Sequence, residues 1–151
     1  MLFRRYLLPV FIFAITLAAC APNSSTFQEN LARWESADLA DYRYVLRVGC
    51  FCPDEIINPV VVEIRGDAVA SITYQETGEQ PGENALQFFN AYDSVEELFA
   101  VIEDAMKQDP AEMSVEYDPN FGVPISISID YDRMMADEEL YLEISEFSEL
   151  E

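Results

Sequence analysis

Hydrophobic and polar residues alternate along residues 41–49, as they do in a β-strand that buries one face. One face of this strand would carry four large apolar side chains: Tyr42, Tyr44, Leu46 and Val48. The other face would carry Arg43, Val45 and Arg47. The same period places Cys50 and Cys52 on the apolar face, and Pro53 ends the alternation. This stretch is therefore predicted to be a core strand.

Short apolar runs bounded by turn residues predict five further strands. They cover residues 60–65, 68–75, 112–118, 123–130 and 139–147. Gly66 and Asp67 give a two-residue hairpin signal of the Gly-X kind, and residues 119–122 supply a second turn. Residues 50–58 are predicted to be a loop, because Pro53 interrupts them and Pro59 follows.

Residues 24–38 have helical spacing instead. Ser25 and Gln28 have the spacing of a capping box, and Phe27, Leu31 and Trp34 recur at helical intervals. The predicted helix would pack this stripe on the sheet, with Trp34 as a core anchor.

A second helix is predicted to begin at another capping box, Ser94 and Glu97, and to stop before Pro110. Its apolar face would consist of Val95, Leu98, Phe99, Ile102, Ala105 and Met106. Residues 76–93, ahead of it, are predicted to be a long surface connection whose aromatic end folds back onto the domain.

Strands that follow one another through hairpin-length turns favour antiparallel pairing. The predicted fold class is α+β: an antiparallel sheet of about six strands with two helices on one face. The predicted element order is α-β-β-β-α-β-β-β.

The first residues resemble a bacterial lipoprotein signal peptide. Arg4 and Arg5 form a basic head, and residues 6–19 are uncharged and too short to cross a bilayer. Residues 17–20, Leu-Ala-Ala-Cys, resemble a lipobox, which implies cleavage before Cys20 and acyl chains on that residue. The alternative is an ordinary signal peptide with a coincidental cysteine. The predicted division is a signal peptide at residues 1–19, a lipidated cysteine and tether at 20–25, and a single α+β domain at 26–151.

Acyl chains on Cys20 would hold the protein on a membrane of the cell envelope. Ala21 after the cysteine resembles the sorting pattern of outer-membrane lipoproteins, so a Gram-negative cell would place the domain in the periplasm. Without the signal peptide, the chain has 29 acidic and six basic side chains. Such a surface repels nucleic acid and anionic headgroups, which excludes both as ligands.

The chain contains no histidine, so Ser-His-Asp and Cys-His systems and the usual catalytic zinc sites lack their base or ligand. No catalytic residue, metal site or cofactor is predicted. Acidic residues do cluster around the last turn: Asp130, Asp132, Asp137, Glu138 and Glu139. This cluster is interpreted as a solvated turn, with a calcium site as the alternative.

Cys50 and Cys52 would be the only free thiols after lipidation, in a compartment that oxidises thiols. A structural disulfide between them is predicted, with copper(I) binding and a redox-active pair as alternatives. Residues two apart in an extended strand are separated by ~6.6 Å, near the upper limit that a disulfide tolerates. The strand is therefore expected to bend at the bridge, with Gly49 and Pro53 beside it.

Several motifs together resemble a family of small bacterial lipoproteins and secreted proteins of unknown function. They are Trp34 in a helix, the Y-R-Y of residues 42–44, the C-x-C-P of residues 50–53, the Y-D-x-x-x-G-x-P of residues 117–124 and the acidic pair Asp137 and Glu138. The resemblance extends over residues 29–147 and implies no activity.

The expected function is a lipid-anchored, non-catalytic protein-interaction or envelope-maintenance module with an unknown envelope protein as partner. An interaction module should expose an apolar or aromatic patch near residues 78–92. The alternative is a ligand- or calcium-binding lipoprotein that uses the acidic turn at residues 130–139 or the connection at 78–92. Thiol redox or metal chemistry at Cys50 and Cys52 is a further alternative.

Overall fold

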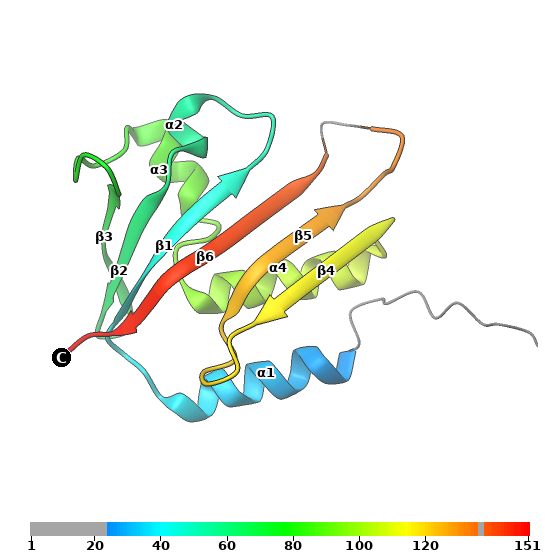
Figure 1. The fold of residues 1–151 in the computed structure, drawn as a ribbon, viewed down its shortest axis with the longest axis horizontal. Helices are drawn as coiled ribbons and strands as arrows, with labels where there is room; N and C mark the ends of the chain where they lie inside the picture. The colour runs from blue at the N-terminus through cyan, green and yellow to red at the C-terminus, as the bar shows by residue number, and fades with distance from the viewer. Residues whose placement is uncertain (1–23, 136–137) are drawn as a thin grey trace, which may run out of the picture.

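The computed structural model describes residues 24–135 and 138–151 and contains a six-stranded antiparallel sheet (Figure 1). The strand order across the sheet is β3-β2-β1-β6-β5-β4. The strands are β1 (Tyr42–Gly49), β2 (Val60–Arg65), β3 (Ala68–Tyr74), β4 (Glu112–Tyr117), β5 (Pro124–Asp130) and β6 (Leu140–Glu149). The predicted α+β class and six antiparallel strands are confirmed.

The predicted core face of β1 is also confirmed. Tyr42, Tyr44, Leu46 and Val48 are each at most 1 % exposed. β1 lies in the middle of the sheet, paired with β2 on one side and with β6 on the other. Because both edges of β1 are paired and one face is buried, the alternation in its sequence was a reliable signal.

Four helices accompany the sheet in the described residues, two more than predicted. They are α1 (Ser24–Ala37), α2 (Asp54–Ile57), α3 (Glu83–Phe89) and α4 (Val95–Gln108). α1 and α4 match the predicted helices. α1 includes Ser24 and Ser25, which were predicted both as the start of the helix at residues 24–38 and as the end of the tether at 20–25. Ser25 lies within the helix and not at its N-cap.

The two additional helices lie in segments that were predicted to be irregular. α2 is a single turn after Pro53, too short to give a helical period, although Asp54 and Glu55 suit a helix N-terminus. α3 has only two buried residues, Ala85 and Phe89, four positions apart. That spacing is a helical signal, but the Gly and Pro residues ahead of it hid it.

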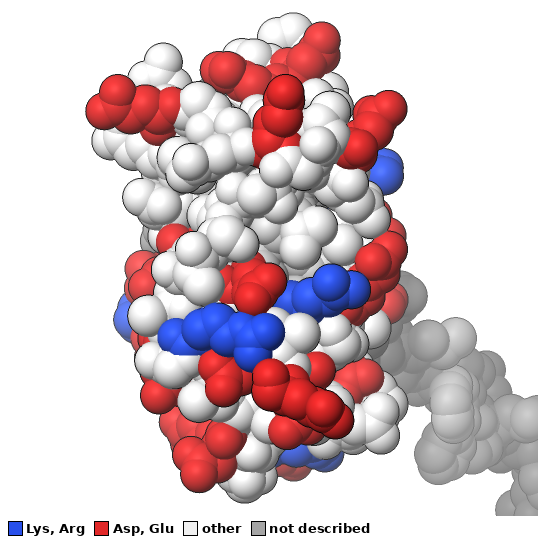
Figure 2. All heavy atoms as spheres, turned by 90° about the vertical axis from the view of Figure 1, so that its left-hand side faces the viewer, with Lys and Arg blue, Asp and Glu red and all other residues white. Residues whose placement is uncertain are grey.

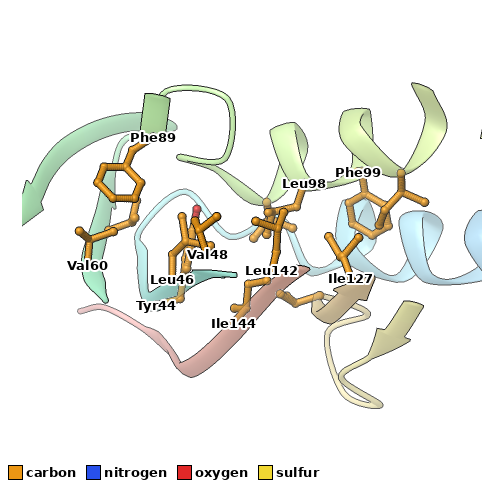
Figure 3. Packing of buried hydrophobic residues seen from close by; sticks show 14 of the residues in the cluster. Tyr44, Leu46, Val48, Val60, Phe89, Leu98, Phe99, Ile127, Leu142 and Ile144 are labelled. Atoms are coloured by element: carbon orange, nitrogen blue, oxygen red, sulfur yellow. The ribbon is translucent and has the colours of Figure 1, made fainter. Parts of the chain in front are cut away.

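α3 and α4 cover the same face of the sheet and bury its apolar side chains. Figure 3 shows Phe89, Leu98 and Phe99 pointing from these helices toward strand residues that include Val60, Leu142 and Ile127. Burying each large apolar side chain of this kind contributes about 1.5–3 kcal/mol. The interface between sheet and helices is therefore the core of the domain.

The N-terminus of α4 has the predicted cap. The Ser94 hydroxyl accepts a hydrogen bond from the backbone N–H of Glu97 at 3.1 Å. The helix ends at Gln108, and its C-cap residue, Asp109, adopts a left-handed conformation with φ of 54° just before Pro110. The sequence signals for both ends of α4 were therefore correct.

One carboxylate joins α1, α4 and β1. Glu96 accepts hydrogen bonds from Trp34 Nε1 at 2.8 Å and from the Tyr42 hydroxyl at 3.2 Å. The Tyr42 oxygen in turn accepts from the buried N–H of Val95 at 3.2 Å, and the Trp34 and Tyr42 rings meet edge to face. Burial raises the pKa of Tyr42 above its ordinary value, and the charge of Glu96 adds to the shift. Trp34 is a core anchor, as predicted.

α1 is also held against the turn between β4 and β5. The Asp118 carboxylate accepts hydrogen bonds from the backbone N–H groups of Asn120 and Phe121, which shapes this turn. Gly122 follows with φ of +76°, and a Cβ at this position would collide with the carbonyl oxygen of Asn30 in α1. Only glycine therefore permits this approach of the helix to the turn.

Within the part of the chain that the structure describes, none of the helices has the length and hydrophobicity needed to cross a bilayer.

Gly122→Ala should destabilise the domain by about 2–5 kcal/mol, because it adds both left-handed strain and a collision with α1. Gly78→Ala is a matched control, since Gly78 has φ of +71° but no atom within 4 Å of the place that a Cβ would occupy. It should cost about 1–2 kcal/mol. Urea unfolding of both variants measures the difference, and equal losses would show that the approach of α1 is not limiting.

Tyr42→Phe should cost about 1–2 kcal/mol at pH 7, because it removes a hydrogen bond to Glu96 and leaves the N–H of Val95 without its acceptor. The folded state raises the pKa of Tyr42, so the hydroxyl's contribution is complete below pH ~10 and is lost as the pH rises toward the folded-state value. The difference between wild type and variant should therefore shrink above pH ~10. Thermal melts at pH 7 and about pH 10.5 test this, with Tyr141→Phe at an exposed position as the control. A difference that stays constant with pH would contradict it.

Candidate functional site

The predicted lipidation site, Cys20, lies outside the described residues. Cys50 and Cys52 lie in the loop after β1, and the structure joins them in a disulfide. Their Cα atoms are 5.2 Å apart, closer than the ~6.6 Å of an extended strand, so the chain bends here as expected. Copper(I) binding would require the reduced pair, whereas a redox-active pair would alternate between the disulfide and the two thiols.

The disulfide presents Phe51 to solvent. Phe51 is the single residue between the bridged cysteines, and it is 93 % exposed. Cys50 and Cys52 themselves pack against the core, which leaves the side chain between them pointing away from it. The bridge therefore holds an aromatic ring outside the domain.

The described residues of the acidic turn are not arranged as a metal site. No group of three or more Asp, Glu, Cys or His residues in the described parts of the chain lies close enough together to hold a metal ion. Asp132 accepts a hydrogen bond from the backbone N–H of Met134 at 3.0 Å, so it stabilises its own turn. Asp137 lies outside the described residues.

The expectation of an exposed apolar or aromatic patch near residues 78–92 is wrong. Phe89 is buried, Phe88 and Tyr92 pack against the core, and the carbonyl of Tyr92 accepts a hydrogen bond from the hydroxyl of Tyr44 at 2.7 Å. The aromatic end of the connection does fold back onto the domain, as predicted. Because α3 turns these rings inward, none of them is among the exposed large apolar side chains of the described chain.

The exposed apolar residues gather at one end of the sheet instead. β1 and β5 are each antiparallel to β6, so the loops that follow them leave at the same end, where β6 begins. Figure 1 shows both loops at the top. Five of the six large exposed apolar side chains in the described chain lie there, and we call them the apolar end: Phe51, Ile57, Met134, Met135 and Tyr141. Exposed apolar side chains that cluster in this way are typical of an interaction surface.

A groove of about 470 Å³, which we call the end groove, opens at the apolar end. Its wall includes Phe51 and Tyr141 together with three carboxylates, Glu112, Asp130 and Glu139. The Tyr141 side chain packs across β1 at Gly49, where an added Cβ would lie 3.2 Å from it. Gly49 therefore makes room for the aromatic wall of the groove.

The carboxylates of the end groove differ in their partners. Oδ1 of Asp130 is buried and has no hydrogen-bond partner among the described residues, which is unusual for a buried polar atom. Glu112 lies 3.6 Å from the guanidinium of Arg133, but both side chains are largely exposed, so this pair contributes little. The groove therefore carries negative charge that the domain does not neutralise.

Negative charge dominates other surfaces as well. Figure 2 shows one side of the domain, where a short band of basic side chains lies between more numerous acidic ones. In the turn before α4, burial raises the pKa of Asp93, and the neighbouring Glu97 adds to the shift. What distinguishes the end groove is the combination of charge with exposed aromatic side chains.

Sequence reasoning missed Phe51 and Tyr141 as surface residues. Phe51 offered a signal, because a side chain between two bridged cysteines cannot continue the strand alternation. Tyr141 offered none, since its neighbours Leu140 and Leu142 made the strand look uniformly apolar. The Met134-Met135 pair was visible, but in the sequence alone it indicates only an interruption of the acidic cluster.

Thiol counting on unfolded, non-reduced protein should find neither Cys50 nor Cys52 free, and the same count after reduction should find both. Reduction should lower the Tm by only a few degrees, because closing a loop of three residues stabilises by about 1.6 kcal/mol. Protein isolated from cells under non-reducing conditions, with its thiols blocked at lysis, is the sample to use. Two titratable thiols in it would favour the metal or redox alternative over the structural bridge.

Comparison with known proteins identifies a family but no activity. Neither a curated protein nor a solved structure matches the chain significantly. A model of a family of unknown function, DUF6174, matches residues 26–149, which is nearly all of the described domain. The chain therefore belongs to the DUF6174 family.

Proposed function

We propose that this protein is a non-catalytic lipoprotein of the cell envelope whose domain binds another envelope protein. The observation that carries the interaction role is the gathering of exposed apolar side chains at one end of the sheet. Scattered exposed apolar residues are normal, but five of the six lie at one end of the sheet, and two of them, Phe51 and Tyr141, line a groove there. This concentration favours a surface that another molecule covers.

The anchor and the apolar end would lie on opposite sides of the domain. α1 contacts the start of β1 through Tyr42, the end of β6 through Phe147 and the β4–β5 turn through Gly122. All three places lie at the end of the sheet opposite the apolar end (Figure 1). An anchor before α1 would therefore leave the apolar end accessible.

The distance to the membrane would be short. α1 begins at Ser24, four residues after Cys20, so the two Cα atoms are at most ~14 Å apart. The eight residues of β1 then extend ~26 Å toward the apolar end. A partner in the periplasm, or one projecting from the same membrane, could reach it there.

A catalytic role has less support. The chain has no histidine, and the buried hydroxyls of Tyr42 and Tyr44 are engaged in hydrogen bonds that join helices and loops to β1. Burial raises the pKa of Tyr44 well above its ordinary value, which makes its hydroxyl a weaker acid than that of a free tyrosine. These groups stabilise the fold. The hydroxyls that line the end groove beside its carboxylates, those of Ser128 and Tyr141, have no histidine to activate them.

Cys20→Ser should release the protein from the membrane fraction, because acyl chains are the only strong membrane contact that the chain would have. The double variant Cys50→Ser, Cys52→Ser makes the same chemical change but keeps Cys20, so it should stay with the membrane. Fractionation in high salt followed by immunoblotting measures both. A Cys20→Ser protein that still pellets would contradict the lipoprotein assignment.

A further inference from the structure

We infer that the end groove docks a segment of a partner protein that carries a lysine or arginine beside an apolar side chain. This inference rests on the proposed interaction function and specifies its surface and the chemistry of the partner. It follows from three features of the groove. The exposed ring of Phe51 lines it, a buried carboxylate oxygen of Asp130 has no hydrogen-bond partner among the described residues, and its volume suits one or two side chains.

Phe51 provides the apolar anchor. A phenylalanine at 93 % exposure stabilises a complex when a partner removes its ring from water. The bridge between Cys50 and Cys52 already fixes the turn that carries it, so binding loses little backbone entropy. Aromatic side chains on preformed turns are the usual centres of binding energy in interfaces.

The carboxylates specify the charge of the partner. Asp130, Glu112 and Glu139 all line the groove, and among the described residues only Glu112 has a basic side chain nearby, Arg133. The buried, unpaired oxygen of Asp130 would gain a donor from an ammonium or guanidinium group. The excess of acidic side chains over the whole domain would also steer a basic segment toward it.

The size of the groove limits what enters it. A volume of about 470 Å³ accepts one or two side chains and not a whole helix. Met134 and Met135, in the loop after β5, lie at the same end and are flexible enough to pack against different apolar neighbours. A loop tip or an extended strand with one basic and one apolar side chain fits this surface.

Two other occupants fit less well. Anionic headgroups would be repelled by Asp54, Glu55 and the carboxylates of the groove, and the predicted anchor lies at the other end of the domain. A second copy of this chain would bring the same large negative charge. A basic protein segment satisfies both the aromatic and the acidic part of the surface.

Photo-crosslinking in cells tests the inference on the full-length chain with Cys20 intact. A photoreactive phenylalanine analogue replaces Phe51 in one variant and Val69 in the other. Val69 is the matched control, because it is exposed and apolar but lies near the start of β3, at the opposite end of the sheet. Position 51 should crosslink to a protein, position 69 should not, and the crosslinked peptide should contain a lysine or arginine next to an apolar residue.

The second part of the experiment removes negative charge from the end groove. Asp130→Asn with Glu139→Gln should reduce the crosslink from position 51 by about tenfold or more, since loss of a buried charge partner is costly. Glu29→Gln with Glu35→Gln removes the same charge from exposed positions of α1 and should leave the yield unchanged. Melting curves of both double variants confirm that each is folded, so a lost crosslink reports binding.

The outcomes separate this inference from the proposed function. A protein crosslinked from Val69 but not from Phe51 would overturn the docking site and keep the interaction role. A crosslink from Phe51 to lipid or to a second copy, or one insensitive to Asp130→Asn with Glu139→Gln, would overturn the basic protein segment as occupant. No crosslink from either position in a correctly anchored protein would overturn the interaction role as well.

Discussion

The pairing of β1 with β6 is the contact on which the rest of the structure depends. It joins a three-stranded meander built from the first half of the domain to another built from the second half. Without it, each half would be a small sheet with an exposed hydrogen-bonding edge and little helix to cover it. The pairing also brings Gly49 opposite Tyr141, so the aromatic wall of the end groove exists only when the two halves meet.

Most of the motif residues that suggested a family make contacts that join one helix, strand or turn to another. Trp34 and Tyr42 meet at Glu96, Tyr44 holds the segment before α4, and Gly122 lets α1 approach a turn. These contacts explain why such residues are needed for the fold without assigning them chemistry. Arg43 differs from them, because its side chain is exposed and makes no hydrogen bond or ion pair among the described residues. A motif can therefore be specific for a fold and still be silent about function.

The sequence predicted the strands well and the surface poorly, for a physical reason. Burial of one strand face imposes a period of two on the sequence, so β1 and β2 could be located to within a residue or so. The helix α3 was missed because its two buried residues, Ala85 and Phe89, give only one helical interval, which the Gly and Pro residues before it obscured. The end groove depends on which loops share an end of the sheet, and that follows from strand order, which hydrophobic pattern does not determine. Phe51 and Asp130 are distant in sequence and were brought together only by the pairing of β1, β6 and β5.

The acidic charge of the domain affects which molecules can bind to its apolar end. A group of exposed apolar side chains at one end of a domain would ordinarily promote self-association. A chain with 29 acidic and only six basic side chains beyond its first twenty residues repels its own copies, which opposes that association. The same charge attracts a basic segment, so one property disfavours the wrong partner and favours the proposed one. On this argument the acidity belongs to the specificity of the surface as much as to solubility, and neutralising the groove alone would weaken partner binding while leaving most of the repulsion between copies in place.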